Sequence, residues 1–135
     1  MDTEKVKSEI LQAEKELLTA LRSGELMKGV SMHHNSPEYR NIWNGEIKTY
    51  DTLKARIKMG MSQGLKNIDY HVRTRDFMVI NNDNVLETIT ATEITSMKDG
   101  STATSGLTAI SILWQRIDNQ WLLGHLHASE LPKGN

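Results

Sequence analysis

The first part of the chain carries hydrophobic residues at the spacing of a helix. Between positions 6 and 21 they recur every three or four residues, which places them on one face. Thr3 is the expected N-cap, and Gly24 follows as a stop signal. The residues of this stripe are Val6, Ile10, Ala13, Leu17 and Leu21.

Two further helices and a hairpin are expected before position 65. Residues 25–32 favour a short helix, and a third helix begins near Asp51 and ends at Gly64. Between them, residues 39–50 read as a small hairpin because Asn44 and Gly45 supply the positive φ angles of a tight turn.

From Leu65 onward the hydrophobic period changes to two, which is typical of strands. Turn residues divide this half into four strands, which we expect to form an antiparallel meander. Helices followed by strands indicate an α+β fold, with the N-terminal helices packed on one face of a curved antiparallel sheet. Residues 1–135 are expected to form a single domain. The expected strands are 66–80, 84–97, 102–117 and 121–129.

The strand registers predict which residues face the helices. Two-residue turns at 82–83 and 99–100 and a three-residue loop at 118–120 give one apolar face, with Trp114 opposite Gly124. Four polar residues are trapped on it: Asp76, Glu87, Glu93 and Thr108. Its apolar members are Ile68, Tyr70, Val72, Met78, Ile80, Val85, Ile89, Ala91, Met97, Ile110, Ile112, Trp114, Leu122, Leu126 and Ala128.

The opposite face is too apolar in its central strands for a surface fully exposed to water. Its rows of Thr, Ala, Ser and Leu suit a flat contact between two sheets. We therefore expect a homodimer formed through this face. The expected interface residues are Thr90, Thr92, Leu113, His125 and His127.

Composition narrows the class of protein. Hydrophobic residues make up 38% and charged residues 24%, as in a soluble globular protein. A net charge of −1 without a basic stripe argues against binding to nucleic acid or membranes. The chain has no cysteine and no Gly-rich phosphate loop, and no signal peptide is evident, so we expect a cytoplasmic protein.

The last two strands carry the most specific motif. SILWQRIDNQWLLGHLHASE (111–130) resembles the Trp, short turn, Trp, then His-x-His-x-Ser that closes SnoaL-like proteins of the nuclear transport factor 2-like superfamily. The association domain of calcium/calmodulin-dependent kinase II is similar. The resemblance implies a cone-shaped barrel, with a ligand pocket between the concave sheet face and the helices, and a homodimer.

Residues that the superfamily uses are only partly matched here. The association domain has arginines where this chain has Ile112 and Ala128, which implies a less cationic pocket. The ketosteroid-isomerase-like branch uses a tyrosine, but the first helix here has none. The epoxide-hydrolase branch uses an Asp-Arg-Asp set, whereas the expected inward face offers Asp76 and Glu93 without an arginine.

The expected pocket is apolar and would take a small apolar or carbonyl-containing ligand. Glu93 is the first catalytic candidate, Asp76 the second, and His34, near the expected mouth, the third. The expected lining residues are Tyr39, Trp43, Met59, Tyr70, Ile112, Trp114, Gly124, Leu126 and Ala128.

His125 and His127 have the spacing of metal ligands on a strand, with His71 as a conceivable third ligand. The resemblance explains the pair as a feature of the fold, so interface residues are preferred, and no metal or cofactor is expected. The sequence thus favours a small-molecule-binding, dimeric cone of unassigned reaction. The alternatives are a lyase- or isomerase-type enzyme that uses a pocket carboxyl or His, and a non-catalytic assembly module.

Overall fold

The computed structural model describes residues 2–132, which form three helices and seven strands. The helices confirm the expected ones in number and order, and the hairpin at Asn44 and Gly45 is present. The elements are α1 (Thr3–Arg22), α2 (Leu26–Ser31), β1 (Arg40–Trp43), β2 (Glu46–Lys48), α3 (Tyr50–Ser62), β3 (Leu65–Asn81), β4 (Asn84–Met97), β5 (Thr102–Thr104), β6 (Thr108–Ile117) and β7 (Gln120–Glu130).

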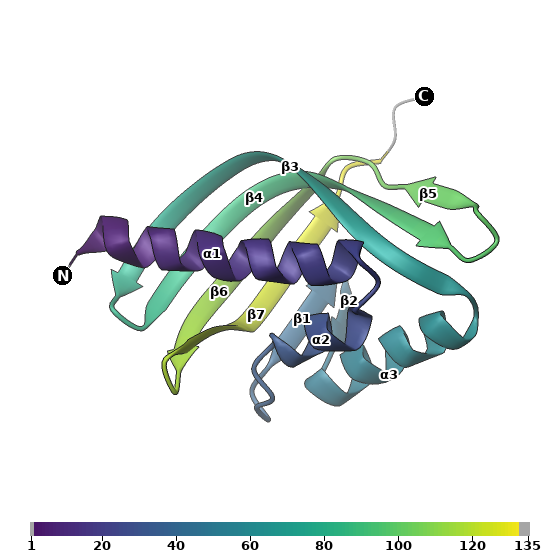
Figure 1. Ribbon diagram of the computed structural model, residues 1–135. Helices are drawn as coiled ribbons and strands as arrows, with labels where there is room; N and C mark the ends of the chain where they lie inside the picture. The colour runs from purple at the N-terminus through teal and green to yellow at the C-terminus, as the bar shows by residue number, and fades with distance from the viewer. Residues whose placement is uncertain (1, 133–135) are drawn as a thin grey trace.

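The strands form one curved sheet in the order β2-β1-β7-β6-β4-β3, with β5 paired to the end of β4. Helix α1 lies across the concave face, and α2 and α3 lie near one end of the sheet (Figure 1). The expected α+β cone is therefore confirmed. One pairing was not foreseen: β1 runs parallel to β7, which places the hairpin at the edge of the meander.

The N-cap of helix α1 lies one residue before the expected one. The Asp2 side chain accepts a hydrogen bond from the backbone N–H of Lys5 at 3.0 Å, so Asp2 is the N-cap and the prediction of Thr3 was wrong. The predicted stripe packs on the sheet, where Val6, Ile10 and Leu17 are buried. Gly24, with a φ of 87°, follows the helix end.

The third expected strand is interrupted. Residues 102–104 pair with the end of β4, whereas residues 108–117 pair with its beginning. At the break, a Cβ on Gly106 would lie 2.4 Å from the backbone oxygen of Leu131, so only glycine allows this close approach. The continuous strand 102–117 was therefore a wrong prediction.

Three bulges in β3 give the sheet its curvature. The pairing with β4 shifts between Leu65 and Asn67, between Val72 and Thr74, and between Val79 and Asn81, so the skipped positions are seven residues apart. Each bulge reverses the side-chain alternation. Met78 and Ile80, expected inside, are 62% and 54% exposed, and Phe77 and Val79 pack against the core in their place.

A fourth bulge lies in β7 at Gly124. The last turn contains two residues, because Ile117 pairs with Gln120, so the three-residue loop at 118–120 was wrong. Trp114 faces Leu123 rather than Gly124, and beyond the bulge Leu113 faces His125. Trp121 and Leu123 are consequently buried inside, and Leu122 leaves the core face.

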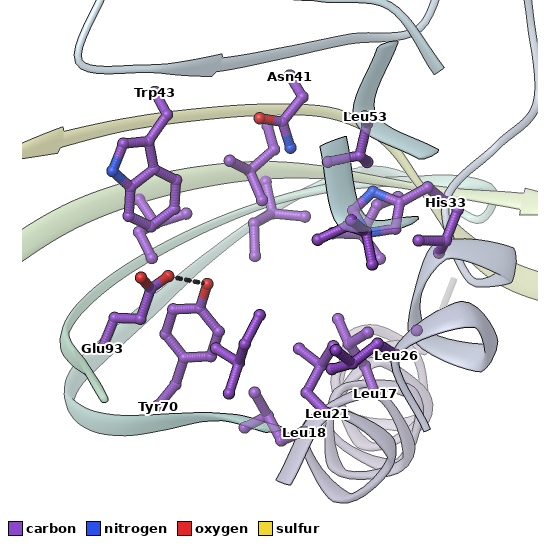
Figure 2. Close-up of a pocket in the computed structure, with 18 of the residues that line it drawn as sticks. Leu17, Leu18, Leu21, Leu26, His33, Asn41, Trp43, Leu53, Tyr70 and Glu93 are labelled. Carbon is purple, nitrogen blue, oxygen red and sulfur yellow. Dashed lines mark hydrogen bonds between the residues drawn. The ribbon is translucent and has the colours of Figure 1, made fainter. Parts of the chain in front are cut away.

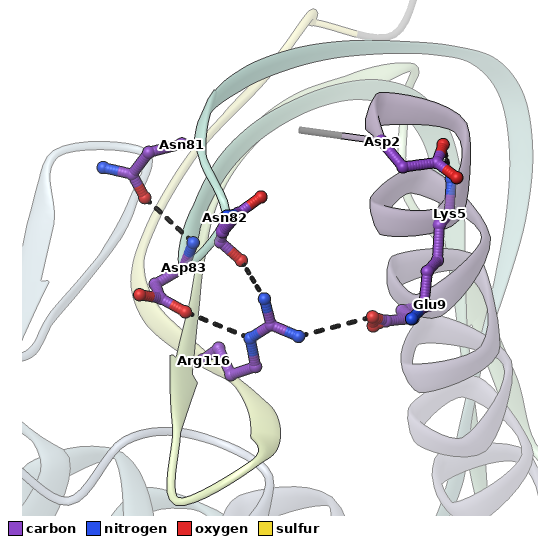
Figure 3. A network of polar contacts seen from close by, with 7 residues as sticks. All are labelled: Asp2, Lys5, Glu9, Asn81, Asn82, Asp83 and Arg116. Carbon is purple, nitrogen blue, oxygen red and sulfur yellow. Dashed lines mark hydrogen bonds and ion pairs between the residues drawn. The ribbon is translucent and has the colours of Figure 1, made fainter.

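Arg116 of β6 ties the N-terminal half of α1 to the turn between β3 and β4. Its guanidinium donates to Glu9 at 3.4 Å, to Asp83 at 3.1 Å and to the carbonyl of Asn82 at 2.5 Å (Figure 3). These contacts are partly exposed to solvent, so they orient α1 more than they stabilise the fold.

The register at the start of β7 can be tested by truncating Leu122 and Leu123. We expect Leu123→Ala to lower the free energy of unfolding by about 2–5 kcal/mol, because it empties a fully buried site. Leu122→Ala, the matched control on the outer face, should cost clearly less. Urea denaturation of both variants measures this, and a three-residue loop at 118–120, which places Leu122 inside, requires the opposite order.

Candidate functional site

A cavity of about 360 Å³ lies between the concave face of the sheet and the helices. Leu17, Leu18 and Leu21 of α1 form one wall, and aliphatic residues of the sheet face them. The helical wall follows from the spacing of the stripe, since residues three and four apart share a face. The sheet residues are Ile68, Ile89, Ile110, Ile112 and Leu126. The site is mostly apolar with a few placed polar groups, as in many small-molecule pockets.

Tyr70 and Glu93 form the first polar group in the cavity. They lie opposite each other on β3 and β4, and the Tyr70 hydroxyl donates to Glu93 Oε2 at 2.5 Å. Trp43 of β1 lies beside them (Figure 2). The bulges in β3 create this pair, because the expected register placed Val72 opposite Glu93.

Burial controls the protonation of this pair. Desolvation raises the pKa of Glu93, the hydrogen bond from Tyr70 lowers it, and the nearby charge of Glu130 raises it again, so the net direction is upward. Burial and the neighbouring Glu93 also raise the pKa of Tyr70 well above its usual range. Glu93 is thus suited to accept and release a proton, while Tyr70 remains a hydrogen-bond donor.

His33, Asn41 and Tyr39 form the second polar group. The Tyr39 hydroxyl accepts from Asn41 Nδ2 at 3.2 Å and lies 2.6 Å from Nδ1 of His33. Burial lowers the pKa of His33 to about 4, so the ring is neutral near pH 7. A hydroxyl accepts up to two hydrogen bonds and donates one, so the contact with Nδ1 fits His33 with its proton on either ring nitrogen. His33 and the Tyr70–Glu93 pair lie on opposite sides of the cavity in Figure 2.

Charged residues of β2 and α3 complete the lining. Glu46 binds Arg56, and Lys48 Nζ lies 3.6 Å from the same carboxylate. The side chains of Glu46 and Arg56 are about half exposed, so this part of the lining reaches solvent. The three groups give the cavity a charged rim.

A third polar group lies where α1 crosses β3 and β4. Arg75 donates from Nε to Glu87 at 3.0 Å and from Nη2 to Glu14. The other Glu87 oxygen accepts from Trp114 Nε1 at 3.0 Å. Burial and the adjacent Glu14 carboxyl raise the pKa of Glu87 to about 8 despite Arg75. One cation is thus shared by two buried carboxyl groups, of which Glu87 holds a proton at neutral pH.

Four of the expected pocket residues line the cavity: Trp43, Tyr70, Ile112 and Leu126. The other five do not. Met59 is 59% exposed on α3, and Tyr39, Trp114 and Ala128 are buried in the protein behind the lining. Gly124 is displaced by its bulge and packs beside Gln115.

Of the catalytic candidates, only Glu93 lies in the cavity. Asp76 is exposed, because the bulge after Val72 turns it outward and Arg75 inward, so the expectation of an inward face without arginine was wrong. His34 is half-buried outside the lining, where its N–H binds the carbonyl of Leu123, and the adjacent His33 takes the cavity position.

Glu14, Arg75, His33 and Asn41 belong to the site but were not among the candidates predicted from the sequence. The inward position of Glu14 could have been predicted from the sequence, since it is the one charged residue within the apolar stripe of the first helix. The inward direction of Arg75 could not have been predicted, because it depends on a bulge that no local sequence signal marks.

The expected interface residues lie away from the cavity. Thr90, Thr92, Leu113 and His125 are half-buried and His127 is exposed, and the dimer stays a prediction. Within residues 2–132, no three His, Asp or Glu side chains are grouped closely enough to hold a metal ion. No helix in that range is long and apolar enough to cross a membrane.

Comparisons with known proteins agree with this architecture. Residues 10–133 match the family described as SnoaL-like domain, and the chain therefore belongs to that family within the nuclear transport factor 2-like superfamily. No match was found among curated proteins.

Three solved structures illustrate the likeness. A protein of Novosphingobium aromaticivorans, provisionally named a scytalone dehydratase, is 11% identical with a TM-score of 0.81, over 97% of this chain and 88% of the other. A superfamily protein from Salmonella enterica serovar Typhimurium is 17% identical, with a TM-score of 0.79 over 98% and 96%. A Xanthomonas campestris protein, provisionally named a calcium/calmodulin-dependent kinase II association domain, is 16% identical, with a TM-score of 0.76 over 93% and 88%. At these identities the likeness concerns the fold.

The proton on Glu87 makes stability depend on pH. Between the ordinary value of 4.5 and the raised value of about 8, the native state binds a proton that the unfolded state has lost. Stability should therefore fall as pH rises across this window, and Glu87→Gln should reduce that slope. Urea denaturation at several pH values measures it. Glu16→Gln, an exposed change on α1, is the control, and equal slopes in Glu87→Gln and wild type would contradict the assignment.

Proposed function

We propose that this protein binds a small, mostly apolar molecule that carries a carbonyl group. The observation that carries the proposal is the apolar cavity with the Tyr70–Glu93 pair inside it. Leucine and isoleucine walls favour an apolar body, and the polar Tyr70–Glu93 pair and His33 favour a polar oxygen on the ligand. The lining lacks the arginines of the association domain at Ile112 and Ala128, which argues against a small carboxylate as ligand.

A second candidate function is proton transfer of the lyase or isomerase type. Glu93 would take a proton from the carbon next to the carbonyl, and the electron pair of that C–H bond would move to the carbonyl oxygen. In a dehydration, the electrons return, the bond to a β-hydroxyl breaks, and the proton on Glu93 leaves with it as water. The dehydratase name of the Novosphingobium protein supports this chemistry.

Binding in the cavity is tested by filling it. Leu18→Trp places a large side chain on the cavity wall, whereas Lys15→Trp makes a comparable change on the exposed side of the same helix. We expect a panel of apolar ketones to raise the melting temperature of wild type and Lys15→Trp, but not of Leu18→Trp. Equal shifts in all three proteins would place binding elsewhere and overturn the proposal.

The proton-transfer function is tested at Glu93 and Tyr70. Glu93→Gln should lower turnover of a β-hydroxy ketone by about 10²–10⁴-fold with little change in binding, because the base is lost. Tyr70→Phe removes the hydrogen bond that lowers the Glu93 pKa, so the low-pH limb of the rate profile should move to higher pH.

Tyr50→Phe is the matched control, since Tyr50 packs on Tyr39 outside the cavity lining. Rates followed by the absorbance of the conjugated product over pH 5–9 measure both effects. Unchanged turnover in Glu93→Gln would rule out this residue as the base, while ketone binding would remain testable by the melting shifts.

A further inference from the structure

Lys48 of β2 is a charged residue that lines the cavity. It pairs with Asn41 across the β1–β2 hairpin, and partners directly opposite each other share a face of the sheet, so both side chains lie on the cavity side. Only 9% of the Lys48 side chain is exposed. Burying an ammonium group costs stability unless its charge and its N–H donors are satisfied. The partners of Lys48 therefore show what this position can do.

The Lys48 ammonium has no hydrogen bond within residues 2–132. Its ion-pair partner, Glu46 Oε1, lies 3.6 Å from Nζ, which is too long for a hydrogen bond, and Arg56 already binds that same oxygen. Nζ is not among the unpartnered side-chain atoms of this range that are closed to water. Since an ammonium group carries three N–H donors, Lys48 has free donors that open onto the cavity.

The charges around Lys48 do not cancel. Lys48 and Arg56 share the single carboxylate of Glu46, which leaves this part of the lining with one positive charge in excess. The other two carboxyl groups of the lining, Glu14 and Glu93, bind partners of their own on β3. An anionic group inside the cavity would supply the missing charge. Its attraction to a buried ammonium is screened less by water than the attraction between exposed groups.

The Lys48 position lies a short distance from the Tyr70–Glu93 pair. Asn41, the partner of Lys48, comes two residues before Trp43 on β1, which is about 7 Å along the strand. Trp43 in turn lies beside the Tyr70–Glu93 pair (Figure 2). A ligand with a single ring and a polar group at each end is therefore long enough to reach both places.

We propose that Lys48 Nζ forms an anion subsite that binds a carboxylate of the ligand. The ligand class is then a keto acid with an apolar body, whose carbonyl lies at the Tyr70–Glu93 pair; this last part rests on the proposed function. The cation is on β2 and not at Ile112 or Ala128, so the carboxylate lies near the charged rim while the apolar body fills the leucine and isoleucine walls.

The subsite is tested with matched probes on the full chain. The first pair is 4-isopropylbenzoic acid and 4-isopropylbenzamide, which have nearly the same shape, differ in charge and carry no ketone. The second pair is 4-acetylbenzoic acid and 4-acetylbenzamide, which add the ketone. Dissociation constants come from calorimetric titration at pH 7. Wild type should bind the acid of each pair about tenfold more tightly than the amide, because an ionised acceptor strengthens the bond to the ammonium.

Lys48→Met removes the charge and keeps an unbranched side chain of similar length. Glu46 retains Arg56 as its partner, so no carboxylate is left unpaired. The preference for the acids should disappear in Lys48→Met. Lys58→Met, which makes the same change of charge on the exposed side of α3, should keep it. Thermal melts establish that both variants fold.

The outcomes separate this proposal from the proposed function. Equal affinities for acid and amide in wild type, or lack of binding by both acids, overturn the subsite without the need for a variant, and leave Lys48 with its ion pair to Glu46 alone. An unchanged preference in Lys48→Met overturns it as well. A preference for the acid in the isopropyl pair, without a gain from the acetyl group, supports the subsite and counts against the proposed function.

Discussion

The curvature of β3 is the constraint on which the rest of the structure depends. A strand of regular alternation would lie flat against α1 and bring its side chains into direct contact, whereas bulges spaced seven residues apart bend it around the helix. The bend leaves room for a cavity and at the same time decides which side chains enter it. Tyr70 opposite Glu93, and Arg75 directed inward, are both consequences of the same shifts in pairing.

The cavity combines an apolar wall with ionisable groups that burial has altered. Glu93 and Glu87 both have raised pKa values because they are desolvated, yet their partners differ: a tyrosine hydroxyl for the first, an arginine and an indole for the second. The first arrangement leaves a carboxyl that exchanges protons beside open space. The second holds a cation between two acids inside the protein. The Tyr70–Glu93 pair is therefore suited to proton exchange, and the network around Arg75 is suited to fixing α1 over the sheet.

The sequence predicted the fold well and the site in part. Helical and strand periodicities, together with Asn44-Gly45, were enough for the element order, and the motif at 111–130 was enough for the family. Glu93 was found because a carboxylate in mid-strand on an apolar face is unusual. Asp76, Met78 and Leu122 were misplaced, because a bulge reverses alternation without leaving a strong local signal. The parallel pairing of β1 with β7 joins segments some eighty residues apart, beyond the reach of any local pattern.

That parallel pairing has a consequence for how the chain folds. β7 follows every other described strand in the sequence, yet it lies between β1 and β6 inside the sheet. During synthesis, β1 and β2 leave the ribosome early, and the edge of β1 that faces away from β2 has no partner strand until β7 emerges. Contacts of such large sequence separation are slow to form, since the loop between them has to close first. The chain therefore exposes an unpaired edge of β1 until β7 is synthesised. Pairing with β7 ends this exposure and completes the sheet.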